Sequence, residues 1–168
     1  MAGKGDDAGM DPPCPQSQDR MAQLAQCYLE ADYLVAVGRR EWRFHVGTLA
    51  AELESVMGAA RYLFVTAWNP LSTDTELAAN MQADQRLQAR LTQACFQHHT
   101  AFGGDAVGNH REHGWLVLDL PEATADLLAG EFRQAGVVYW QRGQPVRLRM
   151  QSPRPAHWQS RDCVDWTG

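Results

Sequence analysis

Residues 61–72 read RYLFVTAWNPLS, and this stretch decides how the rest of the chain can fold. Its run Tyr62–Val65 is rich in aromatic and β-branched residues, which is typical of a buried strand. The strand must end at Asn69, because Pro70 cannot continue the hydrogen-bond ladder and disfavours helical geometry in the residue before it. Ser72 and its neighbours then offer N-cap side chains to a long helical pattern. Since ligands of α/β proteins often lie at such strand ends, polar residues at this turn are candidate site residues.

Composition and charge restrict the class of protein. The chain has 168 residues, of which 45% are hydrophobic and 21% charged, as expected for one soluble globular domain. The net charge of −5 argues against a nucleic-acid partner, because phosphate binding needs a basic surface. No apolar run approaches the roughly 20 residues that span a bilayer, and no apolar signal-peptide segment follows the N-terminus. We therefore expect no membrane contact.

The four cysteines, at positions 14, 27, 95 and 163, are far apart in the sequence and form no CxxC pair. This spacing does not predict a disulfide framework, and it fits a cytoplasmic location. Cys27 and Cys95 fall within helical patterns, where we expect them to be small core residues.

Periodicity divides the chain into two tails and one domain. Residues 1–18 contain few large apolar side chains, and residues 152–168 are rich in Pro, Ser and Arg, so we expect both tails to be disordered. Between them the pattern predicts, in order, a helix from residue 19, a hairpin over 33–46, a helix over 49–57, the strand at 62–65, a helix over 74–97, a loop over 98–113, a strand over 115–120, a helix over 121–136 and a hairpin over 137–150.

This order predicts a mixed α/β domain of the α+β type over residues 19–151. We expect a single mixed sheet of about five or six strands, covered by helices. Because strands alternate with helices in the middle of the chain, we expect parallel pairs there, while the two hairpins add antiparallel ones.

The chain contains the motif TAWNP at residues 66–70, then Asn80, the run EHGWLVL from Glu112 and the run FRQAGVVYW from Phe132. Over about residues 28–148 these features resemble a bacterial family catalogued as domain of unknown function 3293. This chain departs from the family pattern at His113 and Gly114, where the family has a second acidic residue and then a serine. The resemblance implies no activity, but it implies that the characteristic positions are Thr66, Ala67, Trp68, Asn69, Pro70, Asn80, Glu112 and Gln134.

Glu112 is the catalytic candidate among these positions. A carboxylate at the mouth of a partly buried site can have a raised pKa and act as a general acid or base. The alternative is an exposed loop carboxylate without a role in chemistry.

The ligand-binding candidates are Thr66, Trp68, Asn69, Asn80 and Gln134. The amides of Asn69, Asn80 and Gln134 provide donors and acceptors that suit a neutral polar ligand, but they could equally cap the turn and the helix that follows it. Trp68 either stacks on a planar ligand or belongs to the core.

The sequence names neither a metal nor a cofactor. Histidines gather in the 98–113 segment, but an HxxH pair outside a helix lacks the geometry of a zinc site, so we expect no metal. No phosphate-binding glycine loop and no nucleophile elbow occurs either, so the sequence does not say whether the protein is an enzyme.

Two hypotheses about function therefore stand. The first is a pocket for a small polar ligand, with or without enzymatic activity. The second is a non-catalytic interaction or regulatory module with a protein partner, in which the same residues are structural. Convergence of the side chains on an open cavity would favour the pocket, whereas mutual bonding in a closed core would favour the module.

Overall fold

The computed structural model describes residues 15–105, 108 and 110–168. Its elements follow one another as α1 (Pro15–Glu30), β1 (Asp32–Val37), β2 (Arg40–Phe44), α2 (Ala51–Met57), β3 (Arg61–Val65), the 3₁₀ turn η1 (Pro70–Ser72), α3 (Leu77–Gln93), β4 (His98–Gly104), β5 (Arg111–Leu118), α4 (Glu122–Glu131), β6 (Gly136–Gln141), β7 (Arg147–Met150) and β8 (Val164–Trp166). Most of the predicted N-terminal tail lies outside the described residues, but residues 15–18 belong to α1. No helix in the described part of the chain is long and apolar enough to span a bilayer.

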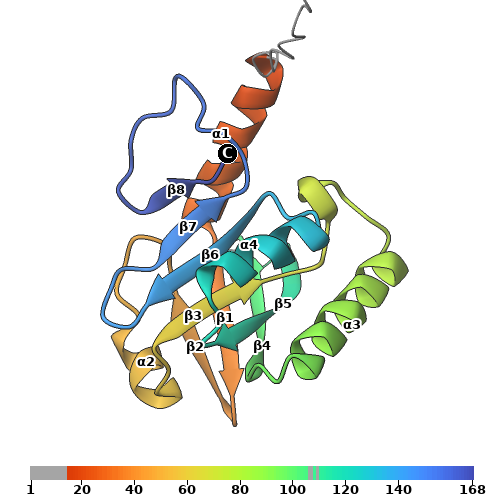
Figure 1. The fold of residues 1–168 in the computed structure, drawn as a ribbon, viewed down its shortest axis with the longest axis vertical. Coiled ribbons are helices and arrows are strands. Elements are labelled where there is room, and N and C mark those ends of the chain that lie inside the picture. The colour runs from red at the N-terminus through yellow and green to blue at the C-terminus, as the bar shows by residue number, and fades with distance from the viewer. Residues whose placement is uncertain (1–14, 106–107, 109) are drawn as a thin grey trace, which may run out of the picture.

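The strands form one sheet in the order β2-β1-β4-β5-β3-β6-β7-β8 (Figure 1). The predicted mixed α/β class is confirmed, and the sheet has eight strands where we expected about five or six. All neighbouring strands are antiparallel except β7 and β8. The parallel pairs expected in the middle of the chain are absent because β3 pairs with both β5 and β6 and so separates the two strands that α4 connects.

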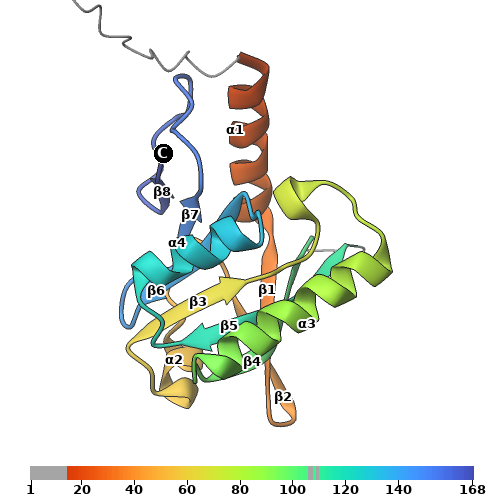
Figure 2. The same cartoon turned by 45° about the vertical axis from the view of Figure 1, so that its right-hand side comes forward.

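The sheet buries apolar side chains on both faces. The side chains of β3 alternate, so that Tyr62 and Phe64 join the cluster under α1 and α2, while Leu63 and Val65 join the cluster under α3 and α4. Figure 2 shows α3 and α4 side by side over one face, while α1 projects from the body of the domain. The first cluster also contains a group of contacting aromatic rings, among them Tyr62 stacked on Trp140 with ring centroids 4.8 Å apart.

The predicted loop over 98–113 is wrong, because β4 and β5 form an antiparallel pair that begins at His98 and continues beyond His113. Glycines made this segment resemble a loop, but they stand where strands pass close to other groups. A Cβ atom on Gly103 would lie 3.1 Å from the Phe64 ring, and one on Gly104 would clash with the His110 carbonyl oxygen. These glycines permit close approach between strands.

The C-terminal segment is ordered by pairing, so the prediction of a disordered tail over 152–168 is wrong for its last residues. Val164–Trp166 forms β8 and pairs in parallel with β7. The Trp158 and Trp166 rings lie 5.4 Å apart in a T-shaped contact and pack against the core. Two tryptophans supply enough apolar surface to fix a segment whose composition otherwise resembles a free tail.

Two predicted core cysteines are also placed differently. Cys27 and Cys95 are both exposed. Cys95 lies outside the helix, in the turn that follows α3, where its φ angle is 59°.

Candidate functional site

The chain makes a sharp corner where β3 ends. Three residues without the freedom of glycine, Asn69, Leu71 and Ser72, have positive φ angles of 47°, 54° and 55°. Such left-handed conformations cost free energy and persist only where surrounding contacts enforce them. One of these contacts joins the corner to the segment before β6, because the Leu71 N–H donates to the Arg133 carbonyl oxygen at 2.7 Å.

Asn80 of α3 holds the corner from the other side. Its side-chain oxygen accepts the Asn69 N–H at 2.9 Å, and its Nδ2 donates to Asn69 Oδ1 at 3.0 Å and to the Thr75 carbonyl at 3.2 Å. Asn69 Oδ1 also accepts the Thr75 N–H at 3.1 Å. Since Asn80 is only 3% exposed and both ends of its amide have partners, its role here is structural.

Glu112 connects this corner to β5. Asn69 Nδ2 donates to Glu112 Oε1 at 2.6 Å. Burial raises the pKa of the Glu112 carboxyl; the hydrogen bond from Asn69 opposes this shift and the nearby charge of Asp74 adds to it. Glu112 is therefore a partly buried strand residue, and the alternative of an exposed loop carboxylate does not hold.

A cavity of about 530 Å³ opens beside this carboxylate. It lies between α1 and the strands β1, β3, β4 and β5, and its wall includes Tyr28, Tyr33, Phe64, Thr66, Ser72 and Glu112. This size is in the range of small-molecule sites. The predicted catalytic candidate Glu112 thus lies at the wall of a cavity. Asn69 bonds to Glu112, Asn80 bonds to Asn69, and neither asparagine lines the cavity.

Tyr28 is the main residue of the cavity that sequence reasoning missed. Burial, and then the charge of Glu112, raise its pKa to about 12, although hydrogen bonds with the Ser72 side chain and the Gly136 backbone act in the other direction. Burial also raises the pKa of Tyr33 well above its ordinary value. Both phenols therefore remain protonated. Tyr28 falls within the helix predicted from residue 19, and nothing in the local sequence of that helix indicated that Tyr28 lies near Glu112 of β5.

The three remaining predicted residues, Thr66, Trp68 and Gln134, take part in hydrogen bonds that stabilise the corner. The Thr66 hydroxyl donates to the His113 carbonyl at 2.6 Å and accepts the Trp68 N–H at 3.0 Å, so it is already satisfied although Thr66 lines the cavity. Gln134 Nε2 donates to the Trp68 and Phe132 carbonyls at 3.1 Å each. The structure brings all six predicted residues to one corner, but of these only Thr66 and Glu112 line the cavity.

A second polar group lies on the opposite face of β5. His113 Nδ1 is 3.0 Å from Asp84 Oδ1, and the Trp115 indole N–H donates to the same oxygen at 3.0 Å. Because neighbouring strand residues point to opposite faces, His113 faces α3 while Glu112 faces the cavity. The His113 carbonyl accepts from Thr66, but among the described residues the His113 and Asp84 side chains make no hydrogen bond to the corner residues.

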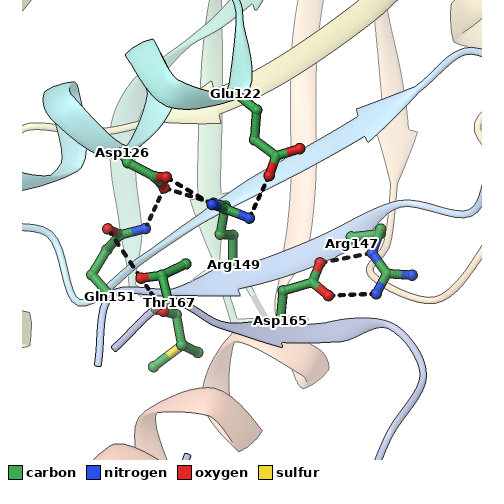
Figure 3. Close-up of polar contacts among 8 residues, drawn as sticks. Glu122, Asp126, Arg147, Arg149, Gln151, Asp165 and Thr167 are labelled. Carbon is green, nitrogen blue, oxygen red and sulfur yellow. Dashed lines mark hydrogen bonds and ion pairs between the residues drawn. The ribbon is translucent and has the colours of Figure 1, made fainter. Parts of the chain in front are cut away.

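A third polar group ties α4 and β8 to β7 (Figure 3). Arg149 makes two hydrogen bonds with the Asp126 carboxylate, at 2.6 and 2.7 Å, and an ion pair with Glu122 at 2.7 Å. Arg147 pairs in the same two-bond manner with Asp165. The hydrogen bonds from Arg149 lower the pKa of Asp126. A cavity of about 370 Å³ adjoins these residues, but each guanidinium already has a carboxylate partner, which is the arrangement of a structural tie.

In the described ranges 15–105, 108 and 110–168, no group of three or more His, Cys, Asp or Glu side chains is arranged to hold a metal ion.

Comparison with known proteins identifies part of the chain. No curated protein and no solved structure matches it. Residues 65–137 match the model of a family described as "Protein of unknown function (DUF3293)". The matched segment contains all six predicted site residues, whereas Tyr28 and Tyr33 of the cavity lie before it. The resemblance noted from the sequence is confirmed over residues 65–137, the part of the chain that is similar to the DUF3293 family model.

Proposed function

We propose that this domain binds a small polar molecule in the cavity beside Glu112. One observation carries the proposal: the carboxylate is held by Asn69 at 2.6 Å and lines a cavity of about 530 Å³, yet it has no cationic partner among the described residues. A buried carboxylate without a counter-charge is costly to the fold, and such groups are typical of functional sites.

The chemistry of the site follows from this carboxyl group. Its pKa is raised by burial, which brings its proton exchange closer to neutral pH and suits it to general acid or base catalysis. Asn69 holds one oxygen of the Glu112 carboxylate by a hydrogen bond, and the contacts at the corner hold the Asn69 side chain in place. Glu112 is accordingly the residue that contacts the ligand, and it is the group that transfers a proton if the bound molecule reacts.

A thermal-shift screen of small polar metabolites tests the proposal. Ligands of the cavity should raise the melting temperature of the wild-type protein and should lose this effect on Glu112→Gln, which keeps an oxygen to accept from Asn69. Glu52→Gln is the matched control, because Glu52 is an exposed residue of α2 that does not line the cavity. The proposal fails if no compound stabilises the protein, or if every compound that does so stabilises Glu112→Gln equally.

The interaction-module alternative also has an observation in its favour. Three large apolar side chains near the corner are exposed, namely Leu71 at 41%, Leu77 at 62% and Met81 at 52%. Exposed apolar side chains of this kind often mark protein contacts. If the screen finds no ligand, crosslinking of a cell extract with wild type and with a Leu77→Ser, Met81→Ser variant tests whether a protein partner binds here.

A further inference from the structure

We infer that the ligand of this cavity is a small organic cation, such as a protonated amine attached to an apolar ring or chain. The inference rests on the proposed function, because it names the class of molecule that the same cavity takes. It is carried by the charge of the cavity wall, by the position of the carboxylate and by the aromatic rings that line the same cavity.

The charged residues around the cavity are mostly acidic. Glu30, Asp105 and Glu112 line it, together with the single imidazole of His110. Neither lysine nor arginine occurs among its described lining residues. An anionic ligand would therefore meet like charges without a basic group to offset them, whereas a cation would be attracted.

Glu112 is the best placed of these carboxylates to bind a cation. Glu30 already accepts a hydrogen bond from Gln26 at 2.6 Å and is exposed, but Glu112 is partly buried. Its neutral partner Asn69 satisfies one oxygen and leaves the negative charge in place. A bound ammonium group would supply the missing counter-charge, and an opposite charge at close range is worth more in a partly buried site than in water.

The rings of Tyr28, Tyr33 and Phe64 belong to the apolar part of the cavity wall, together with Leu24 and Ala31. Tyr33 and Phe64 are in edge-to-face contact, with centroids 5.1 Å apart, so their positions are fixed by each other. Aromatic faces attract ammonium groups and also pack against an apolar body. The cavity wall thus combines acidic side chains with aromatic rings, which matches a cation that carries a ring.

Isothermal titration of the full-length protein with three probes of similar shape tests the inference. Benzylamine is cationic, benzyl alcohol is neutral and benzoate is anionic. We expect benzylamine to bind at least about tenfold more tightly than benzyl alcohol, and benzoate more weakly than either. Glu112→Gln should remove this preference for the cation, whereas Glu52→Gln should retain it. A melting curve of each variant shows that it is folded.

The pH dependence gives a second measurement with a fixed sign. A cation stabilises the charged form of Glu112, so binding must lower the pKa of this carboxyl and release protons. Benzylamine affinity should therefore increase as the pH rises through the raised pKa of Glu112. The observed binding enthalpy should also change with the ionisation enthalpy of the buffer. Neither effect is expected for benzyl alcohol.

Cysteine alkylation locates the bound probe. Cys27 is exposed and lines the cavity, while Cys95 is exposed and does not. Benzylamine should slow the alkylation of Cys27 by iodoacetamide and leave the rate at Cys95 unchanged, as measured by mass spectrometry of peptides.

The outcomes separate this inference from the proposed function. If benzyl alcohol or benzoate binds as tightly as benzylamine, protects Cys27 and depends on Glu112, the cavity is a ligand site and the cation inference is wrong. If benzylamine binds but neither Glu112→Gln nor Cys27 alkylation is affected, the cation inference is wrong as well. If none of the three probes binds, the cation inference falls, and the metabolite screen decides the proposed function by itself.

Discussion

Replacing Asn80 by leucine tests whether the corner network is structural. The change removes three hydrogen bonds, to the Asn69 N–H, to Asn69 Oδ1 and to the Thr75 carbonyl. At about 0.5–1.5 kcal/mol each, these bonds amount to roughly 1.5–4.5 kcal/mol of stability. The added apolar surface of leucine offsets about 0.8 kcal/mol, the value of one buried methylene group. We therefore expect Asn80→Leu to lower the free energy of unfolding by roughly 1–4 kcal/mol.

Urea unfolding followed by tryptophan fluorescence measures this change directly. In a domain of this size, 1 kcal/mol corresponds to about 2–4 °C of melting temperature, so the thermal midpoint should fall by roughly 2–16 °C. Gln85→Leu is the matched control, because it puts the same residue at an exposed position of α3 and should have little effect. Equal or increased stability of Asn80→Leu would refute the reasoning, since it would mean that the partners of Asn80 are hydrated in the native protein.

Three further measurements test other parts of the structure. Because the pKa of Glu112 is raised in the folded protein, the stability of the wild type should decrease as the pH rises from the unfolded-state pKa of Glu112 to its folded-state pKa. Melting curves between pH 4 and 8 should show this decrease for the wild type and not for Glu112→Gln. Arg149→Gln should lower the free energy of unfolding in urea by roughly 1–2 kcal/mol, because Asp126 loses its two charged hydrogen bonds. Since the pKa of Asp126 is lowered in the folded protein, the difference between Arg149→Gln and wild type should disappear as the pH falls through this lowered pKa. Trp166→Ala should cost roughly 1–3 kcal/mol and make the C-terminal segment sensitive to trypsin, whereas resistance equal to wild type would show that the contact with Trp158 does not hold this segment.

The sequence predicted elements well where local pattern and tertiary position agree. The run Tyr62–Val65 alternates between two buried faces, and the structure has β3 there, although β3 ends at Val65, before the expected end at Asn69. The hairpin over 33–46 and the helix that ends at Gly58 were also predicted, because a glycine in a turn and a glycine at a helix C-terminus are local signals. The motif around Asn69 and the resemblance supplied the six candidate site residues, but the sequence left open whether their side chains converge on one corner.

The errors arose where distant contacts outweigh composition. Gly103 and its neighbour Gly104 indicated a loop, but both belong to β4, where Gly103 provides space for the Phe64 ring of β3. Trp166 stands in a segment of tail-like composition that pairs with β7. The contribution of α1 to the cavity could not be predicted, because it requires Tyr28 of α1 to lie near Glu112 at the start of β5, two residues that no local pattern connects.

The position of β2 at the edge of the sheet bears on how this protein behaves at high concentration. One hydrogen-bonding side of β2 has no neighbouring strand in the described part of the chain. An edge of this kind can accept a strand from another molecule, which leads to aggregation. Its exposed residues are Arg40, Glu41 and Arg43, and such charges oppose the approach of a second β2. Removal of these charges should therefore lower solubility even where the stability of the fold is unchanged.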